Sequence, residues 1–457
     1  RLSAPADDRG QVVKHQLSRR RVPLRGARPA TLALLALIAV ESAGAQVRPD
    51  SLTLESVYAQ LDSGTPRIAA ARASARAAEA RIDPARRPPD PELQLGLMNR
   101  RLPGFGLDDV LGMNQIQLMQ MIPIAGQLGL AADVERGRTA AANARALDVR
   151  WEERARAAMV FYELYETDQS IAVARETQRL LRDLVTTTSG MYAVGEERQP
   201  DVLRAQVELA RMTEEIVRME AMRAGAAARL NSVLDRPAET TVPSPVLPAF
   251  PVELPPRDSL ERLALAQRPM LLAGAEDVHA AEAAERLAGR EIWPDLSLGV
   301  QYGWRPMDAG TDHMVSLMVG FRLPIWAGSR QLAMRRETHA MRDMASADLA
   351  AMAATTRGRV GELDAEVHRD LTLLQLYRTT VLPQAGATVA SAMTAYRVGG
   401  VDFMTLLDAR MGENRYRQEV ARFEGELGRA IAELEMLVAT DLLSPPAPLP
   451  GTPGDAR

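Results

Sequence analysis

Four short segments of the chain alternate between apolar and polar or small side chains with a period of two. The clearest lies at about 294–304, where Leu296, Leu298 and Val300 alternate with Ser297 and Gly299. Such a period is typical of β-strands with one apolar and one polar face. The other three segments cover about 92–100, 113–122 and 313–323. With 9–11 residues each, all four have the length of a tilted strand that crosses an outer membrane.

Outside these segments the apolar residues follow a helical spacing. The ranges 127–192 and 329–396 are rich in Ala, Arg, Glu, Leu and Met, and Pro383 is their only proline. Because proline is excluded from helix interiors, they predict helices on the order of 100 Å long, the second bent at Pro383. Further helices are predicted over 200–234 and 402–442, with shorter ones over 65–87 and 269–291.

This order of elements occurs twice. Pro91-Glu-Leu-Gln-Leu-Gly96 matches Pro294-Asp-Leu-Ser-Leu-Gly299, and Tyr192-Ala-Val-Gly195 matches Tyr396-Arg-Val-Gly399, at nearly the same offset along the chain. Landmarks at a constant offset indicate a tandem duplication. We expect a first repeat at 46–235, an extended Pro-rich linker at 236–256 that crosses between the repeats, and a second repeat at 257–443.

The last helix of each repeat has apolar residues at alternating steps of four and three. In the first copy this series begins at Ala205 and includes Met212 and Met219, and in the second copy it includes Phe423. The spacing indicates a seam that packs against another helix, so the methionines are interpreted as core residues and not as metal ligands. Asp402 is expected to cap the last helix.

Composition narrows the possible functions. The chain has no cysteine, which excludes disulfides, thiol chemistry and a cysteine-linked lipid anchor. Its five histidines form no HxxxH or HxH pair, and we find no nucleophile–base pair, P-loop or dinucleotide fingerprint. We therefore expect no enzymatic activity, no metal site and no cofactor. Nearly all basic residues are arginine, and nucleic-acid binding is not expected.

The two ends of the chain have their own character. Residues 1–45 resemble an export signal, because a basic stretch precedes the apolar run Ala30–Val40 and the small-residue motif Ala43-Gly-Ala45. The range 444–457 is rich in proline and glycine and is predicted to be a disordered tail.

Four strands are too few to close a membrane barrel, and open strand edges are costly in lipid. If the strands span a membrane, several chains must therefore share one barrel, and three copies would supply twelve strands. The alternative is that they form ordinary hairpins in a soluble periplasmic coiled-coil scaffold or adaptor.

Over residues 51–442 the sequence resembles the TolC family of outer-membrane efflux channels. The resemblance rests on Leu52-Thr-Leu-Glu55, the paired hairpins, both Tyr-x-Val-Gly motifs and Val381-Leu-Pro-Gln-Ala385. It implies a mainly α fold with β, in which tandem-duplicated long antiparallel helical hairpins carry four membrane strands per chain. It also implies a trimer, in which a twelve-stranded β-barrel continues into an α-helical barrel across the periplasm.

The resemblance implies a passive outer-membrane exit duct of a tripartite efflux system. The implied partners are two further copies of the chain in a homotrimer, a periplasmic adaptor (membrane fusion protein), an inner-membrane pump of the RND type, and outer-membrane lipid. Pro123-Ile-Ala-Gly126 and Val381-Leu-Pro-Gln-Ala385 are most similar to the heavy-metal efflux subgroup. This favours metal cations or mixed cationic compounds as substrate, with drugs or secreted proteins as alternatives.

Two sites follow from the resemblance. The first is the pair of hairpin tips, where adaptor hairpins dock in the family. These tips correspond to Tyr192, Val194 and Gly195 in the first repeat and to Val398 and Gly399 in the second. A second and compatible interpretation is that the glycines close a turn at positive φ.

The second site is a periplasmic gate, which falls on Tyr396, Val401, Thr405 and Asp408. Two aspartates form this constriction in the best-studied member of the family, and here only the second is retained, as Asp408. Three copies of Asp408 around a threefold axis would favour cations. The alternative is that Asp408 is a solvated surface residue.

Overall fold

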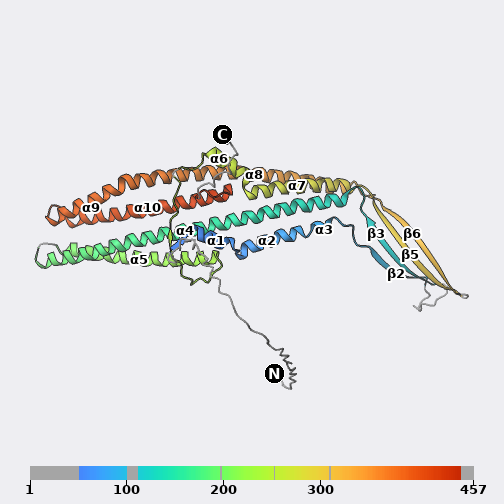
Figure 1. Ribbon diagram of the computed structural model, residues 1–457, viewed down its shortest axis with the longest axis horizontal. Helices are drawn as coiled ribbons and strands as arrows, with labels where there is room; N and C mark the ends of the chain where they lie inside the picture. The colour runs from blue at the N-terminus through green and yellow to red at the C-terminus, as the bar shows by residue number, and fades with distance from the viewer. Residues whose placement is uncertain (1–50, 100–111, 196–197, 252, 308–309, 444–457) are drawn as a thin grey trace, which may run out of the picture. The chain divides into compact units, whose positions relative to one another are not determined.

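The computed structural model describes residues 51–99, 112–195, 198–251, 253–307 and 310–443. The predicted signal at 1–45 and the predicted tail at 444–457 lie outside this part of the chain. The described residues form long helices with a four-stranded sheet at one end of them (Figure 1).

The long helices come in two hairpins. In the first repeat α4 (Gln127–Ala193) turns back into α5 (Gln199–Val233). In the second repeat α8 (Gln331–Leu376) and α9 (Leu382–Arg397) turn back into α10 (Phe403–Val438). A π-helical turn, η1 (Tyr377–Val381), joins α8 to α9 directly before Pro383. The interruption predicted at Pro383 therefore takes the form of a widened turn, because proline has no N–H for the regular ladder.

Several predicted helix bounds were wrong. The last helix ends at Val438, four residues before the predicted 442, because Ala439 adopts a positive φ of 51°. The predicted helix at 65–87 is divided into α2 (Pro66–Glu79) and a short α3 (Ile82–Ala85). The predicted helix at 269–291 is α7 (Pro269–Arg290).

The linker at 236–256 is not extended throughout, because it begins with a turn in which the Thr240 N–H donates to the Pro237 carbonyl at 3.0 Å. Its extended part contains β4 (Ser244–Val246), which pairs in parallel with β1 (Ser51–Thr53). Two helices that the sequence pattern did not reveal, α1 (Leu54–Asp62) and α6 (Arg257–Gln267), precede α2 and α7. Helix α1 packs on α4, and α6 packs on α8.

The sheet has the order β2-β3-β5-β6 and is antiparallel throughout. Its strands are β2 (Glu92–Met98), β3 (Met113–Ile122), β5 (Asp295–Met307) and β6 (Gly310–Arg322), so the second hairpin is longer than predicted. On one face, Val300 lies opposite Leu317, which is 80% exposed. On the other face, Gln301 donates a hydrogen bond to Gln115 at 2.7 Å.

The helices pack side by side in two successive stretches along the length of the bundle, and we call each stretch a layer. Next to the sheet the order is α2-α4-α7-α8, and farther from it the order is α8/α9-α10-α4-α5. In each layer one edge belongs to the first repeat and the other edge to the second. The sheet follows the same rule, with β2 and β6 at its edges.

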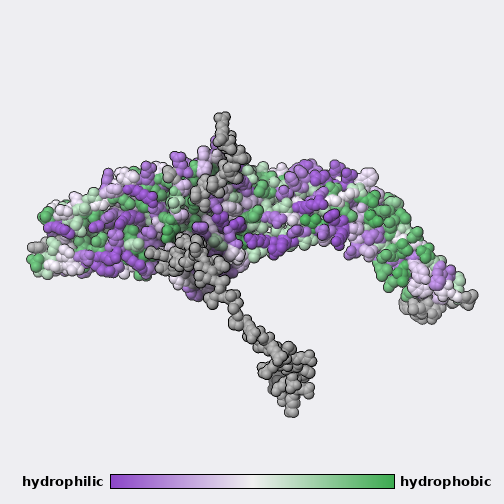
Figure 2. Space-filling view, viewed as in Figure 1, coloured by the Kyte–Doolittle hydropathy of each residue, from purple (hydrophilic) through white to green (hydrophobic). Residues whose placement is uncertain are grey.

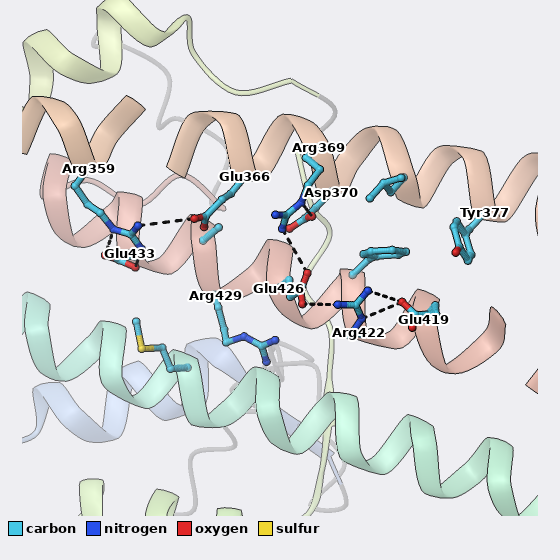
Figure 3. Close-up of a pocket in the computed structure, with 14 residues that line it drawn as sticks. Arg359, Glu366, Arg369, Asp370, Tyr377, Glu419, Arg422, Glu426, Arg429 and Glu433 are labelled. Carbon is cyan, nitrogen blue, oxygen red and sulfur yellow. Dashed lines mark hydrogen bonds and ion pairs between the residues drawn. The ribbon is translucent and has the colours of Figure 1, made fainter. Parts of the chain in front are cut away.

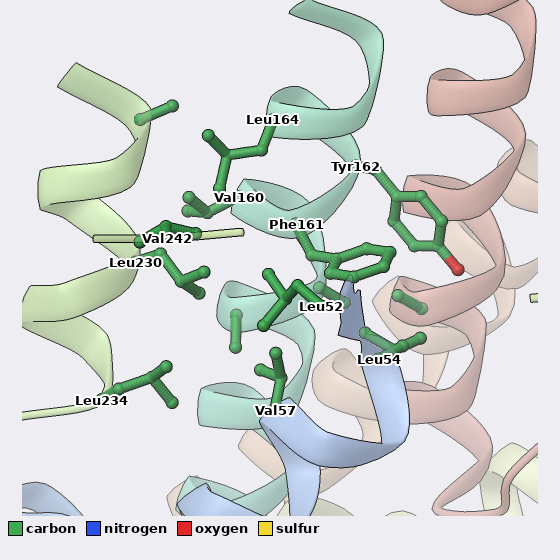
Figure 4. Close-up of a cluster of buried hydrophobic side chains, with 14 of the residues drawn as sticks. Leu52, Leu54, Val57, Val160, Phe161, Tyr162, Leu164, Leu230, Leu234 and Val242 are labelled. Carbon is green, nitrogen blue, oxygen red and sulfur yellow. The ribbon is translucent and has the colours of Figure 1, made fainter. Parts of the chain in front are cut away.

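Buried side chains fill the space where α1, α4 and α5 meet (Figure 4). Phe161 and Tyr162 of α4 are fully buried there, their rings edge to face at 5.3 Å. The predicted seams are confirmed: Met212 and Met219 of α5 and Phe423 of α10 are buried. Among the described residues, no helix combines the length and the apolar character needed to cross a membrane.

Candidate functional site

The two hairpin tips expose a valine beside a glycine. Val194 is 72% exposed and Val398 is 79% exposed. Gly195 and Gly399 have φ angles of 81° and 70°, values that favour glycine. The prediction that these glycines close the turns is therefore confirmed, and each turn presents an apolar side chain to solvent.

The tyrosines of the two tips differ. Tyr192 is half exposed, whereas Tyr396 is buried, with its ring 6.2 Å from the ring of Phe403. The Tyr396 hydroxyl lies 3.9 Å from the Met191 sulfur in the other hairpin. Tyr396 thus belongs to a tip cluster of buried residues from both hairpins, which also includes Met212 and Leu406.

Asp402 caps α10, as predicted. Its carboxylate accepts hydrogen bonds from the backbone N–H of Thr405 at 2.9 Å and from the Thr405 hydroxyl at 2.6 Å. The Thr405 side chain is therefore engaged within its own helix. These two bonds hold the pKa of Asp402 below its usual value, and the bond from the Thr405 hydroxyl has the larger effect.

The remaining residues predicted to form the gate occupy different environments. Val401 is partly buried and packs against the tip cluster. Asp408 is exposed and makes no ion pair with another described residue. Arg415 and Arg422 follow Asp408 at intervals of seven residues and are exposed as well. Asp408 therefore belongs to an exposed stripe that continues along α10.

Farther along that stripe, α8, α10 and α4 form a charged groove of about 880 Å³ (Figure 3). Arg359 of α8 makes two parallel bonds of 2.7 Å to Glu433 of α10. Arg429 of α10 bonds Glu166 of α4 at 3.0 Å. No residue of α1 or α6 is among the described residues that line the groove.

Charge in the groove is compensated. Arg369 pairs with Asp370 at 2.7 Å and with Glu426 at 3.4 Å, and Arg422 also reaches Glu426, at 3.1 Å. Burial raises the pKa of Glu166, an effect that Arg429 opposes. Among the described residues, no three His, Cys, Asp or Glu side chains are grouped so as to hold a metal ion.

The groove was not identified from the sequence. A signal for it exists in α10, where Glu419, Arg422, Glu426, Arg429 and Glu433 follow one another at steps of three and four. That spacing predicts pairs within one helix. It does not reveal that several partners lie on α8 and α4.

Solved structures of bacterial membrane proteins share this fold, among them an outer-membrane protein and an outer-membrane channel. VceC of Vibrio cholerae is 15% identical, with 85% of this chain and 96% of that chain covered and a TM-score of 0.72. A membrane protein of Pseudomonas aeruginosa is 18% identical, with 84% and 93% covered and a TM-score of 0.74. MtrE of Neisseria gonorrhoeae, in its open state, is 13% identical, with 85% and 89% covered and a TM-score of 0.70. No curated protein sequence matches the chain.

The family model described as outer membrane efflux protein matches residues 57–235 and 260–440. The two matched blocks correspond to the two repeats and together cover most of the chain. Proteins of this family are channels and not enzymes, and they act in the outer membrane with a helical portion in the periplasm. This match agrees with the duplicated hairpins and the amphipathic sheet. The chain therefore belongs to the outer membrane efflux protein family, the TolC-type channels of tripartite pumps.

Proposed function

We propose that three copies of this chain close into the exit duct of a tripartite efflux system, with twelve strands in the membrane and a helical tunnel in the periplasm. The observation that carries the proposal is a single contact pattern between the repeats. Within the chain, β3 pairs with β5, α4 packs on α7, and α10 packs on α4. Each contact joins one repeat to the other.

The duplication predicts the same three contacts between neighbouring copies. In repeat terms β6 corresponds to β3, α8 to α4, and α5 to α10. The equivalent contacts are therefore β6 to the next copy's β2, α8 to its α2, and α5 to its α8. These are the open edges of all three layers, so one head-to-tail contact satisfies every edge at once.

The surface of α5 supports this arrangement. A second stripe on α5, beyond its seam with α4, is exposed in the single chain, and Leu203, Val207 and Val217 are 52%, 57% and 61% exposed. Their steps of four and ten residues keep them on one face of the helix. Exposed apolar stripes of this kind mark a protein–protein contact.

The duct is proposed to be passive. Its tips, with Val194 and Val398 exposed, serve as the surface on which a periplasmic adaptor docks, and an inner-membrane pump, of the RND type, drives export. The exposed apolar face of the sheet and the family match speak against the alternative of a soluble scaffold or adaptor.

We further propose that the narrow end of the tunnel favours metal cations or mixed cationic cargo over drugs or secreted protein. Asp408 supports this, because it is an exposed carboxylate without an ion pair among the described residues, whereas the groove wall is charge-compensated. Tyr396 and Val401 shape this end from within the tip cluster, and Thr405 holds the start of α10.

The oligomer is tested by extracting the chain from outer membranes in detergent and measuring its mass by light scattering with the detergent subtracted. A trimer is expected, and a monomer that is soluble without detergent would overturn the duct. The gate is tested by conductance in planar bilayers. Asp408→Asn is expected to reduce cation selectivity, and an unchanged reversal potential would remove Asp408 from the gate.

A further inference from the structure

Where α7 and α8 meet the sheet, a small pocket of about 280 Å³ is lined by arginine and tryptophan. Three of its six residues are arginines, and none carries a carboxylate. Because guanidinium groups match phosphate geometry and a Trp ring supplies apolar contact area, this lining suits an anionic ligand with an apolar part. The lining residues are Leu130, Arg286, Gly289, Arg290, Trp293 and Arg335.

These arginines lack the close carboxylate partners that the arginines of the charged groove have. Arg290 and Arg335 make no ion pair with a described residue, and Arg286 approaches Glu282 only at 4.0 Å. Every arginine in the charged groove of α8 and α10 is paired with a carboxylate. Uncompensated like charges repel one another, so an external anion stabilises the pocket.

A second pocket, of about 400 Å³, adjoins the first and shares Trp293. It adds Arg322 and Arg330, which make no ion pair with a described residue, together with the carboxylates Glu291 and Asp295. Arg330 is the N-cap of α8, whose first turn has no acidic residue. The positive end of the helix dipole therefore adds to the positive charge of this region.

Apolar surface surrounds the arginines. Trp293, Ile325 and Trp326 are 56%, 81% and 76% exposed. Figure 2 shows hydrophobic surface gathered over the strands and the adjoining helix ends, next to more hydrophilic surface along the helices. Exposed tryptophan beside basic residues, at the end of strands with an apolar outer face, is the chemistry of the lipid headgroup level.

We propose that this junction is a binding site for an anionic phospholipid of the periplasmic leaflet. Arg286, Arg290 and Arg335 contact the headgroup phosphate, and Trp293 packs on the glycerol and the first part of the acyl chains. The proposal rests on the outer-membrane location of the chain and does not depend on its adaptor, pump or cargo. Basic pockets at the membrane surface bind headgroups in this way.

Native mass spectrometry of the detergent-purified oligomer tests the site, with phosphatidylglycerol as the probe and phosphatidylcholine as the zwitterionic comparison. The oligomer is expected to retain phosphatidylglycerol selectively. Replacing Arg286, Arg290 and Arg335 together by Gln is expected to weaken its retention on the order of a hundredfold, at roughly fivefold per arginine. The triple Arg→Lys variant keeps the charge and is expected to retain most of the binding.

The matched control places the same charge change far from the sheet, as Arg179→Gln, Arg182→Gln and Arg211→Gln. The proposal is overturned if the triple Arg→Gln variant of the pocket and the triple Arg→Gln control retain the lipid equally, or if both lose it equally. If millimolar glycerol 3-phosphate displaces the bound phosphatidylglycerol as effectively as added phosphatidylglycerol does, the pocket is a site for small anions and not for a lipid. Loss of the oligomer, with lipid retention unchanged in what remains, would identify these arginines as a subunit contact.

Discussion

Helices α5 and α10 occupy equivalent places in the two repeats but have different surroundings. Both use the predicted seam to pack on the long helix of their own hairpin. Helix α10 also packs on α4, and small residues on that second face allow close approach: Ala421, Gly425 and Gly428 are buried. The corresponding residues of α5, Val217, Ala221 and Ala224, are exposed.

The comparison teaches that duplication copies the contact surface but leaves one copy of it without a partner inside the chain. A face that is buried in α10 predicts burial of the equivalent face in α5, and only a second chain can supply it. The difference between the two helices is therefore the strongest indication of how the oligomer closes.

The largest effect is expected from Val217→Arg, which places a charge in the proposed contact between α5 and the next copy. Three contacts, each weakened by roughly 2 kcal/mol, would dissociate most of the oligomer at micromolar concentration. Light-scattering mass in detergent measures this. Leu147→Arg, on an exposed position of α4, is the control and should leave the mass unchanged; equal effects of the two variants would contradict the assignment of this face.

A smaller effect is expected from Gly428→Ala, because a Cβ at this position would overlap the ring of the fully buried Tyr162. Overpacking should cost about 2–3 kcal/mol and lower the midpoint of thermal unfolding, followed by circular dichroism. At Gly225 of α5 the nearest atom to an added Cβ is the end of Arg229, 3.9 Å away. Gly225→Ala should leave the midpoint unchanged or raise it, and a fall as large as that of Gly428→Ala would show that both helices are equally confined.

Ion pairs should distinguish the two helices more weakly. Arg359→Ala removes the two-point pair to Glu433, whose side chain is 20% exposed, and should cost about 1 kcal/mol. Arg229→Ala breaks the pair between α5 and Glu163, both half exposed, and should cost less. Urea unfolding of the two variants side by side gives the difference. A reversed order would mean that exposure does not govern the strength of these pairs.

The smallest effect concerns pH, at the end of each helix. Asn231 of α5 donates to the carbonyls of Ala238 and Thr240, and its repeat equivalent Glu435 accepts the N–H groups of Leu442 and Leu443. Burial raises the pKa of Glu435, and these two N–H bonds oppose the shift. The folded state therefore holds this proton more tightly than the unfolded state does.

It follows that the Glu435 contribution to stability is lost as pH rises, from the usual glutamate value of about 4.3 up through the raised folded value. Glu435→Gln keeps an oxygen acceptor and should flatten this part of the pH profile of thermal unfolding. Asn231→Asp should introduce a pH dependence at the end of α5 that the native chain lacks. Identical profiles for Glu435→Gln and the native chain would rule out this titration.

The amino-acid sequence determined the local structure and the repeat. Periods of two and of three and a half, together with the placement of proline, located all four strands of the larger sheet and the long helices, because side-chain spacing fixes which face of an element is apolar. The Asp402 cap and the glycine turns were also predictable, since their interactions span only a few residues. The pairing of β1 with β4 was not, because those strands are three residues long and far apart in sequence.

Tertiary structure decided which equivalent residues became different. Tyr192 and Tyr396 share a motif, but only Tyr396 meets Phe403 and the opposite hairpin. The paired groove depends on Arg359 and Glu433, which are 74 residues apart. The two seams of α5 and α10 look alike in sequence, and the second neighbour of α10 is set by the order in which the hairpins pack. Contacts between distant segments depend on this packing order, and the spacing of residues within one helix does not determine that order.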